Sequence, residues 1–279
     1  MLVETLKTLA KKVRNSFFMS LILAGLVFSA PMIKANVPIE LNFNPETKSY
    51  ESNENFSWGV LAINSNKATY LPNETAQLEF AVLDEKGAMV CNAELNLTVT
   101  KPDGQTQLLS TKTGEIKINQ AVCRSYALTE VPDYEANYLL TNPGEYQLSL
   151  EAITKNGTHL ITSKIEVKEK ANFIVERQAT TRVYPINKYP VKILVTPQED
   201  YRGTVEEPIP KNFDVFAINH GGQKLNDTIS WEVAWQAGQT YELEYTFDTP
   251  DKNPAFYTTG PLKIGADFSE NRSWQLAVD

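Results

Sequence analysis

Apolar and polar residues alternate in short runs over much of residues 56–279. The runs at 77–82, 94–99 and 145–151 each place an apolar side chain at every second position. A period of two is typical of an antiparallel strand with one buried face and one face in solvent. Helical spacing is nearly absent, so we expect an all-β protein.

Turn-forming residues separate these runs, as at 84–87 (Asp-Glu-Lys-Gly) and 101–104 (Lys-Pro-Asp-Gly). Glycine, asparagine and proline supply the positive or preset φ that a tight reversal needs. Asn156-Gly157, between apolar runs at 148–154 and 158–167, predicts a β-hairpin. Many short strands separated by turns predict a two-sheet sandwich.

A second set of strand-like runs begins after a short charged linker at 169–172. The runs at 231–235 and 241–247 are joined through 236–239 and predict a hairpin with an aromatic inner face. The run at 274–279 predicts either a last edge strand or the end of a chain cut from something longer. We expect two β-sandwiches, at 56–168 and 173–279, after a polar, extended lead-in at 36–55. The strands expected in the second unit lie near 181–184, 191–196, 203–207, 213–218, 229–235, 241–247 and 262–268, after a run that starts at Phe173.

The first unit carries a series of motifs within residues 58–104. Lys-x-x-Tyr-x-Pro at 67–72 precedes Asn73-Glu74, and the turn at 84–87 and a Pro-Asp-Gly at 102–104 follow. This series resembles the early immunoglobulin-like domains of the alpha-macroglobulin family. Asn73 stands where that family usually has glycine, and asparagine also accepts a positive φ. Gly144-Glu-Tyr146 is similar to the Gly-x-Tyr before the penultimate strand of many bacterial immunoglobulin-like domains.

The second unit resembles the repeated β-sandwich domains of bacterial surface proteins. The matching residues are Val205-Glu206, Ile209-Pro210, Phe213, Trp231, Ala237-Gly238, Tyr241, Leu243 and Tyr245. Together the two resemblances imply tandem immunoglobulin-like β-sandwiches in a secreted or surface-displayed module. They specify no ligand. The Cys-Gly-Glu-Gln thioester motif of macroglobulins does not occur in the sequence.

The first 35 residues have the pattern of a secretory signal peptide. A basic head that includes Lys7 and Arg14 precedes an uncharged apolar run, and small residues follow it. We expect cleavage between Ala35 and Asn36, with an uncleaved membrane anchor as the alternative. Either outcome places the remaining chain outside the cytoplasm, as a secreted or cell-surface protein.

The charge of the chain is divided unevenly. Its formal net charge is −8, but residues 1–35 carry five basic residues and one acidic residue, so the remainder carries 21 basic and 33 acidic residues. An acidic exported chain is a poor match for nucleic acid or an anionic membrane, because both bind basic patches. We therefore expect no nucleic-acid partner, and membrane contact only through an uncleaved N-terminal segment.

Cys91 and Cys123 are the only cysteines. We expect a disulfide between them, because disulfides persist outside the cytoplasm. The alternative is a metal or redox pair, which the missing CxxC spacing and the lack of a nearby histidine disfavour.

Other reactive side chains offer little chemistry. We expect His159 to be an exposed strand residue and His220 to lie in a solvated loop. We expect acidic pairs such as Glu206-Glu207 to serve solubility and edge protection. No cofactor is expected, with calcium bound by loop oxygens as the alternative. The four tryptophans could form a sugar-stacking platform, although alternation favours core packing for Trp231 and Trp235.

These observations favour a non-enzymatic extracellular or cell-surface module that acts as a structural spacer, display or adhesion domain pair. Its partner would be an extracellular protein or glycan, bound at loops such as 217–224 and 249–260. The alternative is an accessory part of a larger extracellular enzyme that binds glycan or peptidoglycan. A third hypothesis, protease inhibition, is disfavoured by the missing thioester and bait segments.

Overall fold

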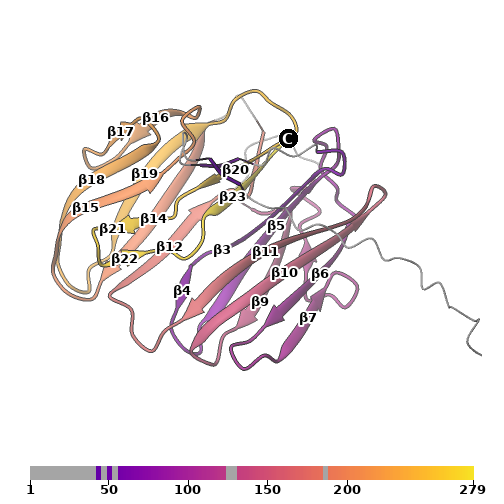
Figure 1. Ribbon diagram of the computed structural model, residues 1–279, viewed down its shortest axis with the longest axis horizontal. Coiled ribbons are helices and arrows are strands. Elements are labelled where there is room, and N and C mark those ends of the chain that lie inside the picture. Colours follow the sequence, from indigo (N-terminus) through magenta and orange to yellow (C-terminus); the bar gives the residue numbers. More distant parts are fainter. Residues whose placement is uncertain (1–41, 45–48, 52–55, 124–130, 185–187) are drawn as a thin grey trace, which may run out of the picture. The chain divides into compact units, whose positions relative to one another are not determined.

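All regular elements in the described part of the chain are β-strands (Figure 1). The computed structural model describes residues 42–44, 49–51, 56–123, 131–184 and 188–279. The predicted signal peptide and its cleavage point at Ala35 and Asn36 lie outside these residues. In the lead-in, β1 (Asn42–Asn44) and β2 (Ser49–Glu51) form an antiparallel pair. The prediction of an all-β protein is confirmed.

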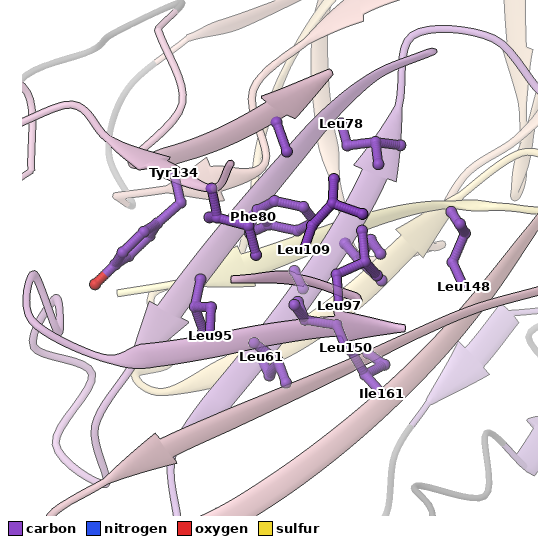
Figure 2. Close-up of a cluster of buried hydrophobic side chains, with 14 of the residues drawn as sticks. Leu61, Leu78, Phe80, Leu95, Leu97, Leu109, Tyr134, Leu148, Leu150 and Ile161 are labelled. Carbon is purple, nitrogen blue, oxygen red and sulfur yellow. The ribbon is translucent and has the colours of Figure 1, made fainter. Parts of the chain in front are cut away.

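Residues 56–167, which we call the first lobe, form two sheets around one hydrophobic cluster. Figure 2 shows side chains from both sheets, including Leu61, Phe80, Leu97 and Leu150, meeting in this cluster. One sheet has the order β4 (Thr69–Tyr70), β11 (Gly157–Val167), β10 (Gly144–Thr154), β6 (Glu94–Thr100) and β7 (Thr106–Ser110). The other has the order β3 (Val60–Ser65), β5 (Thr75–Leu83), β9 (Tyr134–Leu139) and β8 (Lys117–Ile118).

The turns of the first lobe follow the sequence prediction. Strands β10 and β11 pair from Thr154↔Gly157 onward, and Gly157 has a φ of 107°, so the predicted hairpin is confirmed. Asn73 has a φ of 68°, which is the left-handed conformation that glycine or asparagine accepts most readily. The period-two pattern also holds, since every second residue of β6 is buried.

Residues 173–279, which we call the second lobe, surround a second hydrophobic cluster with three sheets. The first sheet has the order β12 (Phe173–Ala179), β14 (Tyr189–Pro197), β19 (Tyr241–Asp248) and β16 (Asp214–Ile218). The second has the order β17 (Gln223–Leu225), β18 (Thr228–Trp235), β15 (Tyr201–Pro208), β21 (Lys263–Ile264) and β22 (Phe268–Ser269). The third has the order β13 (Arg182–Val183), β23 (Trp274–Val278) and β20 (Ala255–Thr259).

The predicted aromatic hairpin between 231–235 and 241–247 is wrong. Strand β18 pairs with β15 and β17, whereas β19 pairs with β14 and β16, so the two runs belong to different sheets. The rings still meet, since Trp235 stacks on Tyr241 with centroids 5.4 Å apart. The predicted strand over 262–268 is likewise two short strands, β21 and β22, joined by a turn. Alternation reveals which face of a strand is buried, but it does not identify the neighbouring strand.

Strand β23 belongs to the cores of both lobes. It is the middle strand of its sheet and all five residues are buried, so the prediction of an edge strand is wrong. Trp274, Leu276 and Val278 pack in the cluster of the second lobe, while Ala277 packs in the cluster of the first lobe. Phe256 of β20 joins the first cluster in the same way. Because neighbouring residues of a strand point to opposite faces, one sheet serves two cores.

Candidate functional site: a buried polar seam between the lobes

A set of buried polar side chains joins β3 of the first lobe to β23 of the second. We call this set the interlobe seam, and it comprises Asn64, Ser65, Glu79, Thr181, Arg272 and Gln275. The Ile63 N–H donates to Gln275 Oε1 at 2.9 Å, and the Gln275 N–H donates to Asn64 Oδ1 at 2.8 Å. Asn64 Nδ2 donates in return to the Gln275 carbonyl at 2.8 Å. Side-chain amides thus satisfy buried backbone groups as the partner strand of a sheet would.

The seam continues from Asn64 to a half-buried carboxyl group, that of Glu79. Asn64 Nδ2 donates to Thr181 Oγ1 at 3.1 Å, and Thr181 Oγ1 donates to Glu79 Oε2 at 3.0 Å. Burial raises the pKa of Glu79 to about 7, although the hydrogen bond from Thr181 opposes this rise. Because Glu79 of the first lobe accepts a hydrogen bond from Thr181 of the second, protonation of Glu79 alters a contact between the lobes.

Arg272 is a buried cation in the seam with few partners. Its Nη2 donates to the Ser65 carbonyl, and its guanidinium lies 5.5 Å from the centre of the Trp274 ring. Nε and Nη1 have no hydrogen-bond acceptor among the described residues. Burial lowers the pKa of Arg272, and the negative charge of Glu270 opposes this change.

A second buried arginine, Arg177, has carboxylate partners at both terminal nitrogens, while its Nε has no partner among the described residues. Its guanidinium binds Glu207 with both ends, at 2.6 and 3.0 Å, and its Nη2 also donates to Glu270 at 2.9 Å. All three side chains are between 0 and 1% exposed. Tyr245 donates to Glu207 at 3.2 Å, which further satisfies that carboxylate. The Arg177 N–H also donates to the Asn66 carbonyl of the first lobe at 2.7 Å.

Arg182 forms an ion pair across the lobes. Its Nε donates to Asp133 of the first lobe at 2.9 Å, and its Nη1 donates to Asp279 at 3.2 Å. Burial raises the pKa of Asp279 to about 6, and the charge of Arg182 opposes the rise. These ion pairs are buried, so solvent and salt screen them far less than they screen surface pairs.

Two buried carboxylates, those of Glu207 and Glu270, bind the Arg177 guanidinium. Glu207 is closed off from solvent, so it has no access to a substrate. Paired catalytic acids must instead flank a substrate in a cleft. The expectation that Glu207 serves solubility at the surface is wrong, while its neighbour Glu206 is exposed.

The structure confirms the predicted disulfide. Cys91 and Cys123 are bonded, with their Cα atoms 5.8 Å apart, so they are not free to bind a metal. In the described residues, no group of three or more histidine, cysteine, aspartate or glutamate side chains could hold a metal ion. A search of the same residues finds no helix long and apolar enough to span a membrane.

Two predictions about aromatic residues need correction. Trp231, Trp235 and Trp274 are buried, so the four tryptophans do not form a sugar-stacking platform. His159 is not an exposed strand residue, because its ring stacks on Trp58 with centroids 4.6 Å apart. Burial lowers the pKa of His159. His220, in contrast, is exposed as expected.

One of the two predicted partner-binding loops is shorter than expected. In the segment at 217–224, the ends of β16 and β17 flank a turn whose residues His220 and Gly221 are exposed. In the segment at 249–260, however, residues 255–259 form the buried strand β20.

The sequence reasoning missed Arg177, Glu207, Glu270 and Arg272. A signal was available for the first two residues. Arg177 lies an even number of positions from buried Phe173 and Val175, and Glu207 lies two positions from buried Val205. Each charged side chain therefore points to the inward face of its strand. Inward charged residues at matching positions indicate a buried ion pair.

The comparisons with known proteins bear on the fold alone. No protein-family model and no curated protein matches the sequence. Salmonella alpha-2-macroglobulin reacted with methylamine is 15% identical, with a TM-score of 0.29, over 81% of this chain and 16% of that chain. Trypsin-activated alpha-2-macroglobulin from Escherichia coli is 14% identical, with a TM-score of 0.31, over 80% of this chain and 16% of that chain. The native conformation of the E. coli protein is 12% identical, with a TM-score of 0.27, over 81% of this chain and 17% of that chain.

This chain is similar to bacterial alpha-2-macroglobulins to that extent. It spans 16–17% of the length of those proteins.

Proposed function

We propose that this protein is a non-enzymatic extracellular or cell-surface module in which two immunoglobulin-like β-sandwich lobes act as one rigid spacer and display a partner-binding surface. The observation that carries the proposal is strand β23, whose two faces pack into the two cores. Domains joined only by a linker move relative to one another by default. Two lobes that share a buried sheet have no surface along which to hinge.

The polar contacts of the seam support the same proposal. Opening the lobes would expose or unpair the backbone groups of Ile63 and Gln275, together with the Arg182 contact to Asp133. Each buried polar group left without a partner costs about 1–3 kcal/mol. Such contacts are directional, so they resist sliding as well as separation.

Export is supported by the N-terminal pattern and by the disulfide. A bond between Cys91 and Cys123 suits an oxidising compartment. The display surface that we favour is the exposed turn at 217–224, which lies between edge strands β16 and β17. A protein or glycan partner would bind there.

Distances between the lobes test the rigid pair. Spin labels on Gln107→Cys in the first lobe and Glu232→Cys in the second both occupy exposed strand positions. Pulsed electron paramagnetic resonance should give one narrow distance distribution, whereas a broad or multiple distribution would overturn the proposal. Asn64→Ala in the same labelled chain is the matched comparison, and it should broaden the distribution.

The non-enzymatic part has a separate test. The purified protein should leave defined polysaccharide, peptide and ester substrates intact. Turnover that is lost on substitution of one carboxylate or histidine would contradict this part without bearing on the rigidity of the lobes.

A further inference from the structure

A cavity of about 360 Å³ lies between β11 of the first lobe and the segment before β23. Its lining includes Ser163, Lys164, Thr258, Glu270, Asn271 and Arg272. The Lys164 side chain is 42% exposed, so solvent reaches the cavity on that side. A single water needs only about 10–15 Å³. The cavity is therefore large enough for a small organic molecule.

Arg272 supplies an unpaired positive charge to the cavity wall. The residue is only 8% exposed, and its Nε and Nη1 donors have no acceptor in the described part of the chain. A buried charge without a partner is costly, and a charge-assisted hydrogen bond to an anion removes much of that cost. The two arginine nitrogens therefore favour an acidic group in the cavity.

The neighbouring residues define the rest of a complementary molecule. Asn271 Oδ1 and Glu270 Oε1 are buried acceptors without a described donor. The other oxygen of Glu270 is bound by Arg177, so this carboxylate is largely neutralised within the protein. A simple anion would satisfy Arg272 alone. A molecule with a carboxylate and a hydroxyl or N–H donor would pair with the free donors of Arg272 and with the free acceptors of Asn271 and Glu270.

We infer that this cavity binds a small organic carboxylate that also carries hydrogen-bond donors, with Arg272 holding the carboxylate and Asn271 and Glu270 accepting from the donors. Two sources have this chemistry, an acidic sugar and the acidic residue of a peptide. Because both lobes line the cavity, the inference rests on the proposed packing of the lobes, but its test measures ligand binding and not the distance between the lobes.

Two matched pairs of probes test the inference. Glucuronate and glucose differ in the carboxylate, as do N-acetylaspartate and N-acetylasparagine. The purified protein should show a saturable shift of the Arg272 Nε–H resonance in NMR spectra with at least one carboxylate probe, and none with its neutral counterpart. A response to glucuronate alone would assign the site to sugars, and a response to N-acetylaspartate alone would assign it to peptides. Acetate should bind more weakly than the responding probe.

Substitutions separate the site from general charge effects. Arg272→Gln should weaken binding of the responding probe by about tenfold or more. Arg202→Gln removes an exposed positive charge elsewhere and should leave binding unchanged. If Arg272→Gln does not fold, Ser163→Asp places a negative charge on the cavity wall and should abolish binding.

Three results would overturn the inference. The first is the absence of a saturable shift with either carboxylate probe at concentrations that fill a millimolar site. The second is an equal response to the neutral probes. The third is unchanged binding by folded Arg272→Gln or Ser163→Asp.

Discussion

Glu207→Gln is the substitution that tests the buried ion cluster most directly. The change keeps the shape of the side chain but removes the charge that faces Arg177 at 2.6 and 3.0 Å. The Gln amide nitrogen would then face an arginine donor. Arg177 would retain only Glu270 as a charged partner.

The expected loss of stability follows from the burial of these groups. Breaking a buried ion pair by removing one partner costs about 3–5 kcal/mol, because the remaining charge stays in a poorly solvating interior. A change of 1 kcal/mol shifts the midpoint of thermal unfolding by about 2–4 °C in a domain of 150–250 residues. Glu207→Gln should therefore lower the midpoint by about 6–20 °C.

Glu206→Gln provides a matched control at the adjacent position. Its side chain lies on the opposite, exposed face of β15 and forms no ion pair among the described residues. The control should change the free energy of unfolding by less than about 0.5 kcal/mol. Urea unfolding and calorimetry of both variants measure the difference. Equal, small effects would refute the reasoning that Glu207 is buried with Arg177.

Three further predictions follow from the seam and the disulfide. Burial raises the pKa of Glu79 from 4.5 to about 7, so the folded state binds the proton more tightly than the unfolded state. The free energy of unfolding therefore falls as the pH rises from about 4.5 to about 7. The free energy of unfolding of Glu79→Gln, measured with urea and compared with that of the natural protein, should rise by about 2–3 kcal/mol as the pH increases from about 5 to about 8. A pH-independent difference would contradict this assignment. Reduction of Cys91–Cys123, separated by 32 residues, should cost about 3–4 kcal/mol, measured by thermal unfolding with and without reductant. An unchanged midpoint of thermal unfolding after full reduction, verified by mass, would show that the disulfide does not stabilise the fold. Asn64→Ala should cost about 1–3 kcal/mol, because it leaves buried Gln275 backbone groups unpaired. A loss no greater than that of an exposed alanine substitution would show that the amide is dispensable.

Local features of the chain could be predicted from the sequence. Alternation identified the strands of the first lobe, and the Asn156-Gly157 turn fixed the register of β10 and β11. The positive φ of Asn73 followed from its place in a turn motif. Each of these features depends on residues close together in the chain, where propensity and turn geometry act directly.

Features that depend on distant contacts could not be predicted in this way. The alternation of buried and exposed residues in β18 and β19 is compatible with two neighbours in one sheet and equally with strands of two different sheets. The burial of His159 depends on Trp58, which belongs to a distant segment. Arg272 follows no strand pattern, and only the packed lobes reveal that its guanidinium lies against a cavity. Tertiary packing decides these features, and a single sequence contains no direct record of it.

The place of β23 in both cores sets an order of assembly. A chain that leaves a ribosome or crosses a membrane with its N-terminus first delivers this strand after nearly all the others. Until then the first cluster lacks Phe256 and Ala277, and buried Ile63 and Asn64 lack their partners on Gln275. We expect the nascent polypeptide to stay incompletely folded until β23 emerges and to close both lobes together at that point.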